Sequence, residues 1–448
     1  MRIMVFVVVV TLAQVTVPAA EVEIRRTIDI APVWAGHPVG FHLLTHGDRQ
    51  YVAFYDAERR MTVGARTLEA DRFQLVRLPE KVGWDSHNSV CMVVDDDGHV
   101  HLSGNMHCAP LTYFRTARPH NITAFERIDR MVGAREKRVT YPRFFRGPAN
   151  ELIFTYRDGG SGNGDQIYNV YDHEKQAWRR MLDSPLTDGR GRMNAYLHGP
   201  VKGPDGYFHL CWVWRDTPDC ATNHDPSYAR SKDLRHWETA AGRPIRLPMT
   251  VETPGLIVDP VPPGGGVING NVVLGFDSKR RVIVSYHKFD AEGKTQLYNA
   301  RLEGGRWRIV RVTDWDYRWD FRGGGAIVFE VRVGGVRLSP EGKLVQSCRH
   351  VKRGSGFFLV DEATLRHIGR SPGGRPRPKQ LGKVESAFPG LKVRWAGDSG
   401  SGGAGGIRYA LRWETLPANR DRPRKPPLPE PNMLRLYEFL EPVAKQER

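Results

Sequence analysis

The stretch YFHLCWVW (207–214), followed after a polar interval by SYARS (227–231), is the clearest copy of a pattern that decides the fold. Each copy has a first run of apolar, aromatic or β-branched residues, a polar interval, and a second such run. Short runs of this kind, with almost no long helical periodicity, are typical of all-β proteins. The first runs lie at QYVAFY (50–55), HVHLSG (99–104), ELIFTY (151–156), YFHLCWVW (207–214), RVIVSYH (281–287), KLVQSC (343–348) and RYALRW (408–413).

The spacing of these copies separates a propeller from a sandwich or a barrel. Successive first runs begin roughly 50 to 75 residues apart, close to the period of kelch-type blades. Seven copies of about four strands each predict an all-β, seven-bladed β-propeller with four-stranded antiparallel blades. We expect residues 21–448 to form this one domain. Trp178, Trp237 and Trp307 fall where outer strands should begin, and we expect them to pack between blades rather than to bind sugar.

The composition and the first residues indicate an exported protein with a polyanionic partner. Lys and Arg number 66 against 50 Asp and Glu, which gives a net charge of +16 and favours nucleic acid, anionic lipid or acidic glycan. Residues 1–20 have a basic start, a short apolar run and small residues at the end, which predicts a signal peptide. We therefore expect a secreted or periplasmic protein with no nucleic-acid partner, and no membrane partner after signal cleavage.

Chain direction predicts which side chains gather on one rim. In an antiparallel blade the first strand begins on the rim where the second strand ends, because the two strands run in opposite directions. Loops on one rim of a rigid β scaffold are where binding and catalytic residues are usually found. The residues that this rule places together are His87, His107, Tyr141, Arg157, Tyr196, His198, Arg215, His287 and Arg349.

This set of cations, imidazoles and phenols matches the chemistry of β-elimination next to a uronic acid. An Arg or a protonated His can neutralise the carboxylate and so acidify the C5 proton. A Tyr or a His can remove that proton and protonate the departing O4. Hydrolysis would instead need a pair of carboxylates in most glycosidase families. The candidates for that pair on the same rim are Asp56, Asp158 and Asp216.

Several segments in order resemble the BNR-repeat family that contains the seven-bladed ulvan lyases. They are WDSHNSV (84–90), GNMHCAPLTYF (104–114), YPRF (141–144), YRDGGSGNGDQ (156–166), NAYLHGP (194–200) and NHDPSYARSKD (223–233). The resemblance covers roughly residues 35 to 240. It implies cleavage of ulvan, a sulfated polysaccharide of rhamnose and uronic acid, with Tyr141 as base and acid. It assigns Arg157 to the carboxylate, and His87 and His107 to charge neutralisation or proton transfer. The same resemblance assigns substrate contact to Tyr196. From the rim we also expect His198, Arg215 and His287 to contact substrate, together with Asn105.

The resemblance also implies a structural metal site. His209 and Cys211 are two residues apart in a predicted strand and so share a face, and Cys220 and His224 follow in the next loop. Two sulfurs and two imidazoles suit tetrahedral zinc, so this set predicts a structural zinc ion and no organic cofactor.

Two other functions fit the same residues. A related propeller could act as a glycoside hydrolase on rhamnose or glucuronate linkages, and a non-catalytic propeller could bind acidic glycan without cleaving it. Lyase activity creates unsaturated sugar ends, hydrolysis creates only reducing ends, and binding alone leaves the polymer length unchanged. We expect a monomer in each case.

Overall fold

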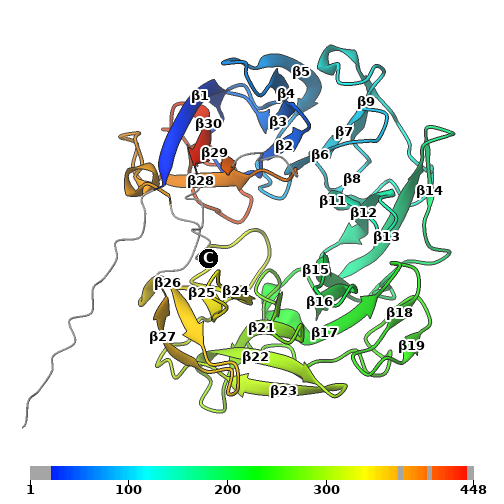
Figure 1. Cartoon of the computed structure of the whole chain (residues 1–448), viewed down its shortest axis with the longest axis vertical. Coiled ribbons are helices and arrows are strands. Elements are labelled where there is room, and N and C mark those ends of the chain that lie inside the picture. Colours follow the sequence, from blue (N-terminus) through cyan, green and yellow to red (C-terminus); the bar gives the residue numbers. More distant parts are fainter. Residues whose placement is uncertain (1–21, 372–376, 401–405, 441–448) are drawn as a thin grey trace, which may run out of the picture.

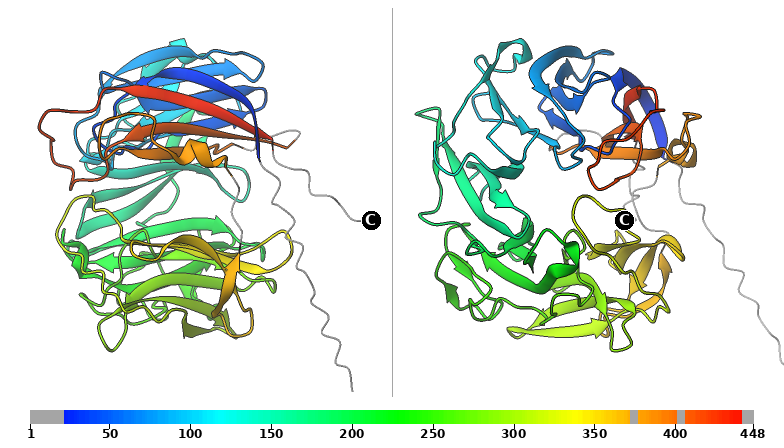
Figure 2. Two further views of the ribbon diagram at one scale, coloured as in Figure 1. Left: turned by 90° about the vertical axis from the view of Figure 1, so that its left-hand side faces the viewer. Right: turned by 180° about the vertical axis from the view of Figure 1, so that it is seen from behind.

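The computed structural model describes residues 22–371, 377–400 and 406–440. These residues form seven antiparallel sheets of four or five strands. Figure 1 shows the sheets arranged in chain order around a common centre, and Figure 2 shows the molecule from the side and from behind. The predicted all-β class and the antiparallel, mostly four-stranded sheets are confirmed. The predicted signal peptide lies outside the described residues.

Each sheet corresponds to one predicted blade. Blade one has β2 (His42–His46), β3 (Arg49–Tyr55), β4 (Arg60–Thr67) and β5 (Gln74–Lys81). Blade two has β6 (Val90–Val94), β7 (Val100–Gly104), β9 (Tyr113–Thr116) and β10 (Phe125–Arg127). Blade three has β8 (His107–Ala109), β11 (Val139–Arg146), β12 (Leu152–Gly160), β13 (Asn163–Asp172) and β14 (Ala177–Arg180). Blade four has β15 (Asn194–Lys202), β16 (Phe208–Arg215), β17 (Asn223–Ser231), β18 (Trp237–Glu238) and β19 (Pro244–Ile245).

The remaining blades follow the same order, and the last one joins the two ends of the described chain. Blade five has β20 (Val273–Phe276), β21 (Val282–Phe289), β22 (Thr295–Glu303) and β23 (Arg306–Arg311). Blade six has β24 (Val331–Leu338), β25 (Leu344–His350), β26 (Gly354–Val360) and β27 (His367–Ser371). Blade seven has β28 (Lys392–Gly397), β29 (Ile407–Thr415), β30 (Asn432–Leu440) and the N-terminal strand β1 (Glu23–Val33). Because β1 pairs with β30, a strand from the beginning of the chain completes the last sheet.

Burial explains why the first runs of the sequence pattern are so apolar. All eight residues of β16 are buried, since a middle strand is covered on both faces by the neighbouring blades. The outermost strand β23 is half-exposed instead. Three short 3-10 helices, η1 (Ile122–Ala124), η2 (Cys220–Thr222) and η3 (Lys379–Gly382), lie in the connections. Within the described residues, no helix has the length and apolar character that crossing a bilayer requires.

All three tryptophans predicted to pack between blades do so, although one of them is only partly buried. Trp178 and Trp237 are 7% and 2% exposed, and their indole N–H groups donate to Tyr113 Oη and to the Leu234 carbonyl. Trp307 also packs on an aromatic neighbour, Tyr228, with ring centroids 5.1 Å apart, but it is only partly buried. The five cysteines are all free thiols, so no disulfide stabilises the sheets.

Candidate active site

The register of the first two strands in each blade brings the predicted rim residues together. Asn194 at the start of β15 pairs with Arg215 at the end of β16, and Val139 at the start of β11 pairs with Asp158 near the end of β12. One connection differs from the expectation. His107 does not remain with blade two but opens β8, which crosses to blade three and pairs with β11, so that His107 lies opposite Thr140.

An irregularity in β11 presents Tyr141 to the rim. The pairing of β11 with β12 shifts between Thr140 and Arg143, and Tyr141 has a φ of 55°. A non-glycine residue in this left-handed region costs of the order of 1 kcal/mol and persists only where its surroundings hold it. The Tyr141 ring lies 5.8 Å from the rings of both His87 and His107. The break in regular pairing thus places the phenol beside the two imidazoles.

A carboxylate that the sequence analysis did not single out fixes the two histidines. His87 Nδ1 is 2.7 Å and His107 Nδ1 is 2.6 Å from the two oxygens of Asp85. Burial alone would raise the pKa of Asp85, but these hydrogen bonds outweigh burial and hold the pKa well below its usual value. An ionised carboxylate only accepts hydrogen bonds, so both Nδ1 atoms carry a proton. Each Nε2 is then free to donate or accept in the pocket.

Arg157 lies between the two tyrosines of the site. It is 2% exposed, and its guanidinium carbon is 5.0 Å from the Tyr141 ring centre and 5.2 Å from that of Tyr196. Its Nε donates to the Gly159 carbonyl, and its two terminal nitrogens are buried beside Tyr196 with no carboxylate partner among the described residues. A buried charge without a carboxylate partner is costly, and here the rings of the two phenols provide cation–π contacts.

The two phenols have opposite electrostatic environments. Enclosure by the pocket walls and the neighbouring Tyr196 raise the pKa of Tyr141, although the residue is 37% exposed and Arg157 and Arg215 act in the other direction. Burial would also raise the pKa of Tyr196, but the charges of Arg157 and Arg215 outweigh it, and a hydrogen bond from Ser161 adds to their effect, so that this pKa is lowered. The Tyr196 oxygen is 2.7 Å from Ser161 Oγ and accepts a 3.3 Å bond from Arg215.

A pocket of about 280 Å³ draws residues from several blades and is lined by His87, His107, Tyr141, Ser161, Tyr196 and Arg215, whereas Arg157 and Asp85 are not among its lining residues. Its far side carries two arginines that the sequence analysis did not single out, Arg332 of β24 and Arg394 of β28. Burial and the nearby charges of Arg349 and Arg394 lower the pKa of Arg332 to about 10. We call Arg332, Arg349 and Arg394 the arginine wall. None of the three forms an ion pair with a carboxylate of the described residues, so the pocket is cationic on both sides.

Three residues predicted to contact substrate are not among those lining the pocket. His287 is 1% exposed and packs against Trp319 and Phe321, and burial lowers its pKa to about 4. Asn105 donates to Glu80 and to the Lys81 carbonyl. His198 lies further along β15, where burial and then Arg143 lower its pKa. The rule that sorted residues by rim ignores side-chain direction, which is why it included His198 and His287.

The four predicted zinc ligands do not come together, so that site is wrong. His209 lies near the start of β16 and bonds to Tyr228 and Asp205. Cys220 and His224 follow the other end of that strand, about six residues and so about 20 Å away. His224 is held by Asp216 and Asp225, and Cys211 is packed in the core. The sequence pattern gave the faces of the residues but not the length of strand that separates them.

Two other groups of described residues could hold a metal ion. They are Asp85 with His87 and His107, and Asp95 with Asp97 and His173. In the first group a metal would have to displace the protons that both Nδ1 atoms share with Asp85. The observed hydrogen bonds therefore explain that group without a metal.

The described lining of the pocket contains no Asp or Glu. Of the carboxylates considered for hydrolysis, Asp56 pairs with Arg77, Asp158 lies by Arg135, and Asp216 bonds His224. Asp85 and Asp421 contact His87 rather than the open pocket. A pair of carboxylates facing one sugar, which hydrolysis needs in most glycosidase families, is not formed by these residues.

A family model described as a BNR repeat-containing family member matches residues 49–315, more than half of the chain. The chain belongs to the BNR repeat-containing family. This BNR repeat-containing chain is also 27% identical over 158 residues to the short-isoform ulvan lyase of Alteromonas sp. (strain LOR). That match covers 31% of this chain and 28% of the relative, so the chain spans less than a third of the curated relative's length.

Solved structures share the architecture of this BNR repeat-containing chain. The crystal structure of polysaccharide lyase Uly1 aligns with a TM-score of 0.59 at 14% identity, over 93% of this chain and 99% of that one. A PL25 ulvan lyase bound to -[GlcA(1-4)Rha3S]- aligns with a TM-score of 0.57 at 12% identity, over 88% and 97% of the two chains. At these identities the likeness establishes the fold.

Proposed function

We propose that this chain is a secreted or periplasmic lyase that cleaves an acidic polysaccharide by β-elimination at a uronic acid. The observation that carries the proposal is one pocket lined by two phenols, two imidazoles and Arg215, with the buried guanidinium of Arg157 next to both phenols. This arrangement offers a carboxylate partner and proton-transfer groups in one pocket. The ulvan lyases among its relatives and structural neighbours support the same reaction class.

The first step is neutralisation of the uronate carboxylate. The Nε2 atoms of His87 and His107 can donate to the carboxylate oxygens when protonated, and the charge of Arg157 next to the two phenols adds to the attraction. Binding in this way stabilises the enediolate that forms when the C5 proton leaves, because negative charge then moves onto the carboxylate oxygens. Asp85 keeps both imidazoles in the orientation that this step needs.

The two phenols can then divide the proton transfers. Tyr196, whose pKa is lowered by the two arginines, suits the base that takes the C5 proton. Tyr141, whose pKa is raised, stays protonated and suits the acid that gives a proton to O4. The C5–H and C4–O4 bonds break, the C4–C5 double bond forms, and one proton enters and one leaves the enzyme. The sequence-based prediction gave both roles to Tyr141, and the variants below separate the two schemes.

The arginine wall favours a substrate with a second anionic group. Arg332 and Arg394 line the same pocket as Tyr141, and unpaired like charges attract an oxyanion such as a sulfate ester on the neighbouring sugar. The structural neighbour that carries -[GlcA(1-4)Rha3S]- has a sulfated sugar next to its uronate. We therefore propose a sulfated, uronic-acid-containing polysaccharide such as ulvan as the substrate class.

Incubation of the purified protein with ulvan tests the proposal. Unsaturated uronic ends should form, seen as a rise in ultraviolet absorbance, together with shorter products. Tyr141→Phe should reduce that rate on the order of 100-fold or more, because it deletes the proton that O4 receives. Tyr196→Phe should do the same if the phenols divide the steps, and should leave most of the rate if Tyr141 performs both.

Two outcomes would replace the lyase assignment. Reducing ends without ultraviolet absorbance would show a hydrolase, and retention on ulvan without any shortening would show a glycan-binding propeller. Desulfated ulvan in the same assay reports on the second anion. Tyr168→Phe, a phenol buried in blade three away from the pocket, is the matched control and should keep the wild-type rate.

A further inference from the structure

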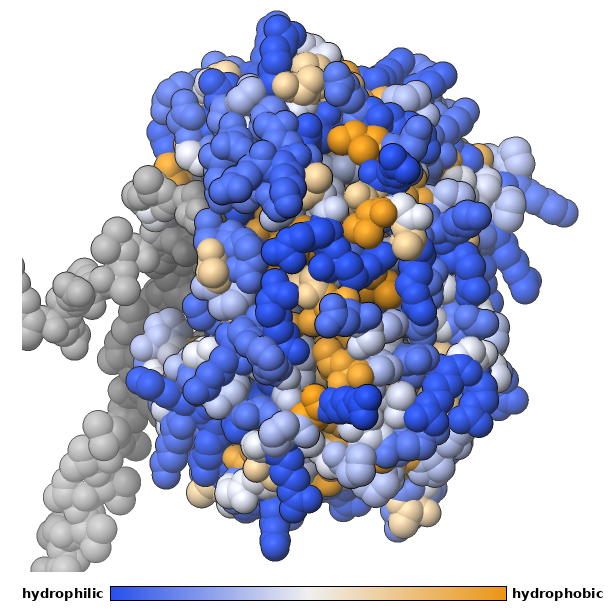
Figure 3. Space-filling model, turned by 90° about the vertical axis from the view of Figure 1, so that its right-hand side faces the viewer, coloured by the Kyte–Doolittle hydropathy of each residue, from blue (hydrophilic) through white to orange (hydrophobic). Residues whose placement is uncertain are grey.

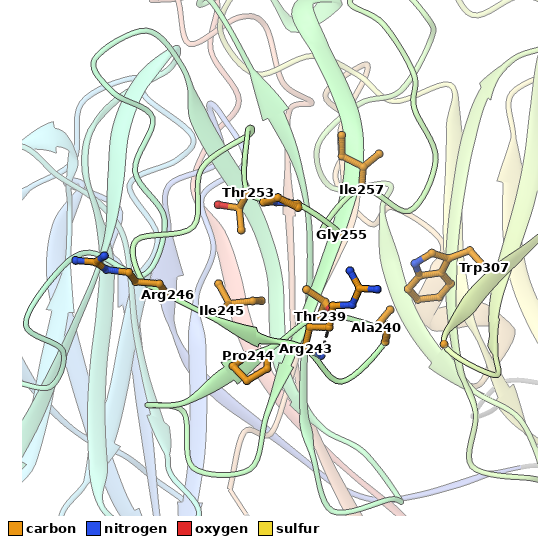
Figure 4. Close-up of a pocket in the computed structure, with 13 residues that line it drawn as sticks. Thr239, Ala240, Arg243, Pro244, Ile245, Arg246, Thr253, Gly255, Ile257 and Trp307 are labelled. Atoms are coloured by element: carbon orange, nitrogen blue, oxygen red, sulfur yellow. Dashed lines mark hydrogen bonds between the residues drawn. The ribbon is translucent and has the colours of Figure 1, made fainter.

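A second cavity lies outside the candidate active site, between the outer edges of blades four and five. Its volume is about 560 Å³, twice that of the pocket around Tyr141. The residues that matter for its chemistry are Thr239, Arg243, Ile245, Arg246, Ile257 and Trp307. Figure 4 shows Trp307 at one end of this cavity and Arg246 at the other, with Arg243 between them. We call this cavity the outer groove.

Trp307 behaves differently from the other two blade tryptophans. The indole N–H groups of Trp178 and Trp237 are satisfied inside the protein. The Trp307 indole is half-buried against Tyr228, and its nitrogen is directed toward the cavity (Figure 4). An indole with one supported face and a free N–H is a surface on which a sugar ring can stack and form a hydrogen bond.

The charge of the outer groove is positive. Arg243 and Arg246 are exposed and form no ion pair with a carboxylate of the described residues, whereas Arg230 of the same blade pairs with Glu238. No Asp or Glu is among the described residues that line this groove. Two unpaired guanidinium groups next to an aromatic ring match a ligand that carries both sugar rings and negative charge.

The outer groove continues toward the rim that carries the candidate active site. A third cavity, of about 450 Å³, shares Arg246 and Thr253 with the outer groove. It is also lined by Asp188 and by the ion pair of Arg190 with Glu252. The loop that carries Asp188 bonds to the start of β13, where Gly164 N–H donates to the Met193 carbonyl and Gly189 N–H donates to Asp165. Ser161, two residues before β13, lines the pocket around Tyr141. Figure 3 shows apolar surface gathered in a broken line on the side where β14, β18 and β19 lie.

We propose that the outer groove is a second, non-catalytic binding site for an anionic polysaccharide chain. Trp307 stacks on a sugar ring while Arg243 and Arg246 bind carboxylate or sulfate groups along the chain. The choice of ligand rests on the proposed function, but the site itself does not need the lyase chemistry. Binding a distant part of the polymer raises the local concentration of cleavable linkages at the pocket, as a tethered second site does.

Native gels that contain ulvan test the site through retardation of the full-length protein. The double variant Arg243→Glu/Arg246→Glu should bind ulvan at least about fivefold more weakly, because it reverses both charges. Arg306→Glu, which reverses an exposed arginine of β23 outside the groove, is the matched control and should stay within about twofold of wild type. Trp307→Ala should weaken binding to the same polymer, and a thermal unfolding curve checks that it still folds.

Activity on two substrate lengths separates this site from the catalytic pocket. The double variant should cleave a short oligosaccharide at the wild-type rate and show a raised KM only on the polymer. The inference would be overturned if the double variant were retarded in ulvan gels as strongly as the wild-type protein. If the wild-type protein is retarded but never cleaves, and the double variant is not retarded, the groove stands while the lyase assignment fails. Carboxyl-reduced and desulfated ulvan in the gels show which anion the arginines bind.

Discussion

At the scale of single residues, the candidate site depends on a few side chains held in uncommon positions. Tyr141 has a left-handed backbone, and the buried Arg157 has no carboxylate partner among the described residues. Both features cost folding free energy, of the order of 1 kcal/mol or more each. Such costs are typical of sites arranged for a ligand, since the bound anion removes the penalty of the unpaired charge.

Arg215 should control the pH at which the enzyme becomes active. Its charge helps to lower the pKa of Tyr196, and the base must be deprotonated, so activity rises with pH through that pKa. Arg215→Gln removes the charge, raises the pKa of Tyr196 and should move the rising limb of the profile upward by about one pH unit. The measurement is kcat/KM against pH on ulvan oligosaccharides. Arg306→Gln should leave the limb in place, and an unshifted limb for Arg215→Gln would exclude Tyr196 as the base.

At the scale of elements, one buried hydroxyl joins three strands beneath the site. Thr140 Oγ1 accepts a 2.6 Å bond from Cys108 N–H of β8 and donates a 3.0 Å bond to the Gly159 carbonyl of β12. Thr140 precedes Tyr141, and it lies opposite His107 in the ladder. This contact therefore sets the distance between the phenol and the imidazole.

Thr140→Val should impair catalysis more than stability. The isosteric change removes both hydrogen bonds and should lower the free energy of unfolding by about 1–2 kcal/mol. Because β8 is then free to shift, we expect kcat to fall about tenfold or more. Thr155→Val removes a similar buried hydroxyl, bonded to the Ile167 carbonyl, away from the pocket. Equal losses of activity in the two variants would contradict a positioning role for Thr140, and urea denaturation provides the stability comparison.

At the scale of the whole molecule, histidines buried without charge link stability to pH. The pKa of His287 is lowered to about 4 by burial, below the ordinary value of 6.5, and burial lowers the pKa of His37 likewise to about 4. Between pH 4 and pH 6.5 these histidines bind more protons in the unfolded chain than in the folded one. The free energy of unfolding therefore decreases as the pH falls from 6.5 to 4.

His287→Leu should flatten this dependence. The variant removes one group that must be neutral in the folded state, so it should lose less stability than wild type between pH 6.5 and pH 4, by up to about 3 kcal/mol. Urea denaturation at the two pH values gives the difference. His46→Leu removes an exposed histidine and should leave the slope unchanged. If the free energy of unfolding of His287→Leu changes with pH as steeply as that of wild type, then the His287 imidazole is already protonated in the folded wild-type protein.

The repeat of short apolar runs was enough to predict the all-β class, the antiparallel strands and a shared rim for Tyr141, Arg157, Tyr196 and Arg215. The reason is that strand direction alternates along the chain, and alternation is visible in the order of residues. The YPRF and YRDG segments resemble those of the family that contains the ulvan lyases, and this resemblance added expected roles for these residues. Their roles stay proposals until the variants are measured.

Contacts between distant segments were decided only by the tertiary structure. The crossing of β8 to blade three, the carboxylate of Asp85 between two imidazoles, and the arginine wall from blades six and seven depend on how blades pack around the centre. The same packing separated His209 from His224 and buried His287, against the prediction. A sequence pattern reports the period and the direction of strands, whereas side-chain aim and blade-to-blade distance arise from packing that no local pattern contains.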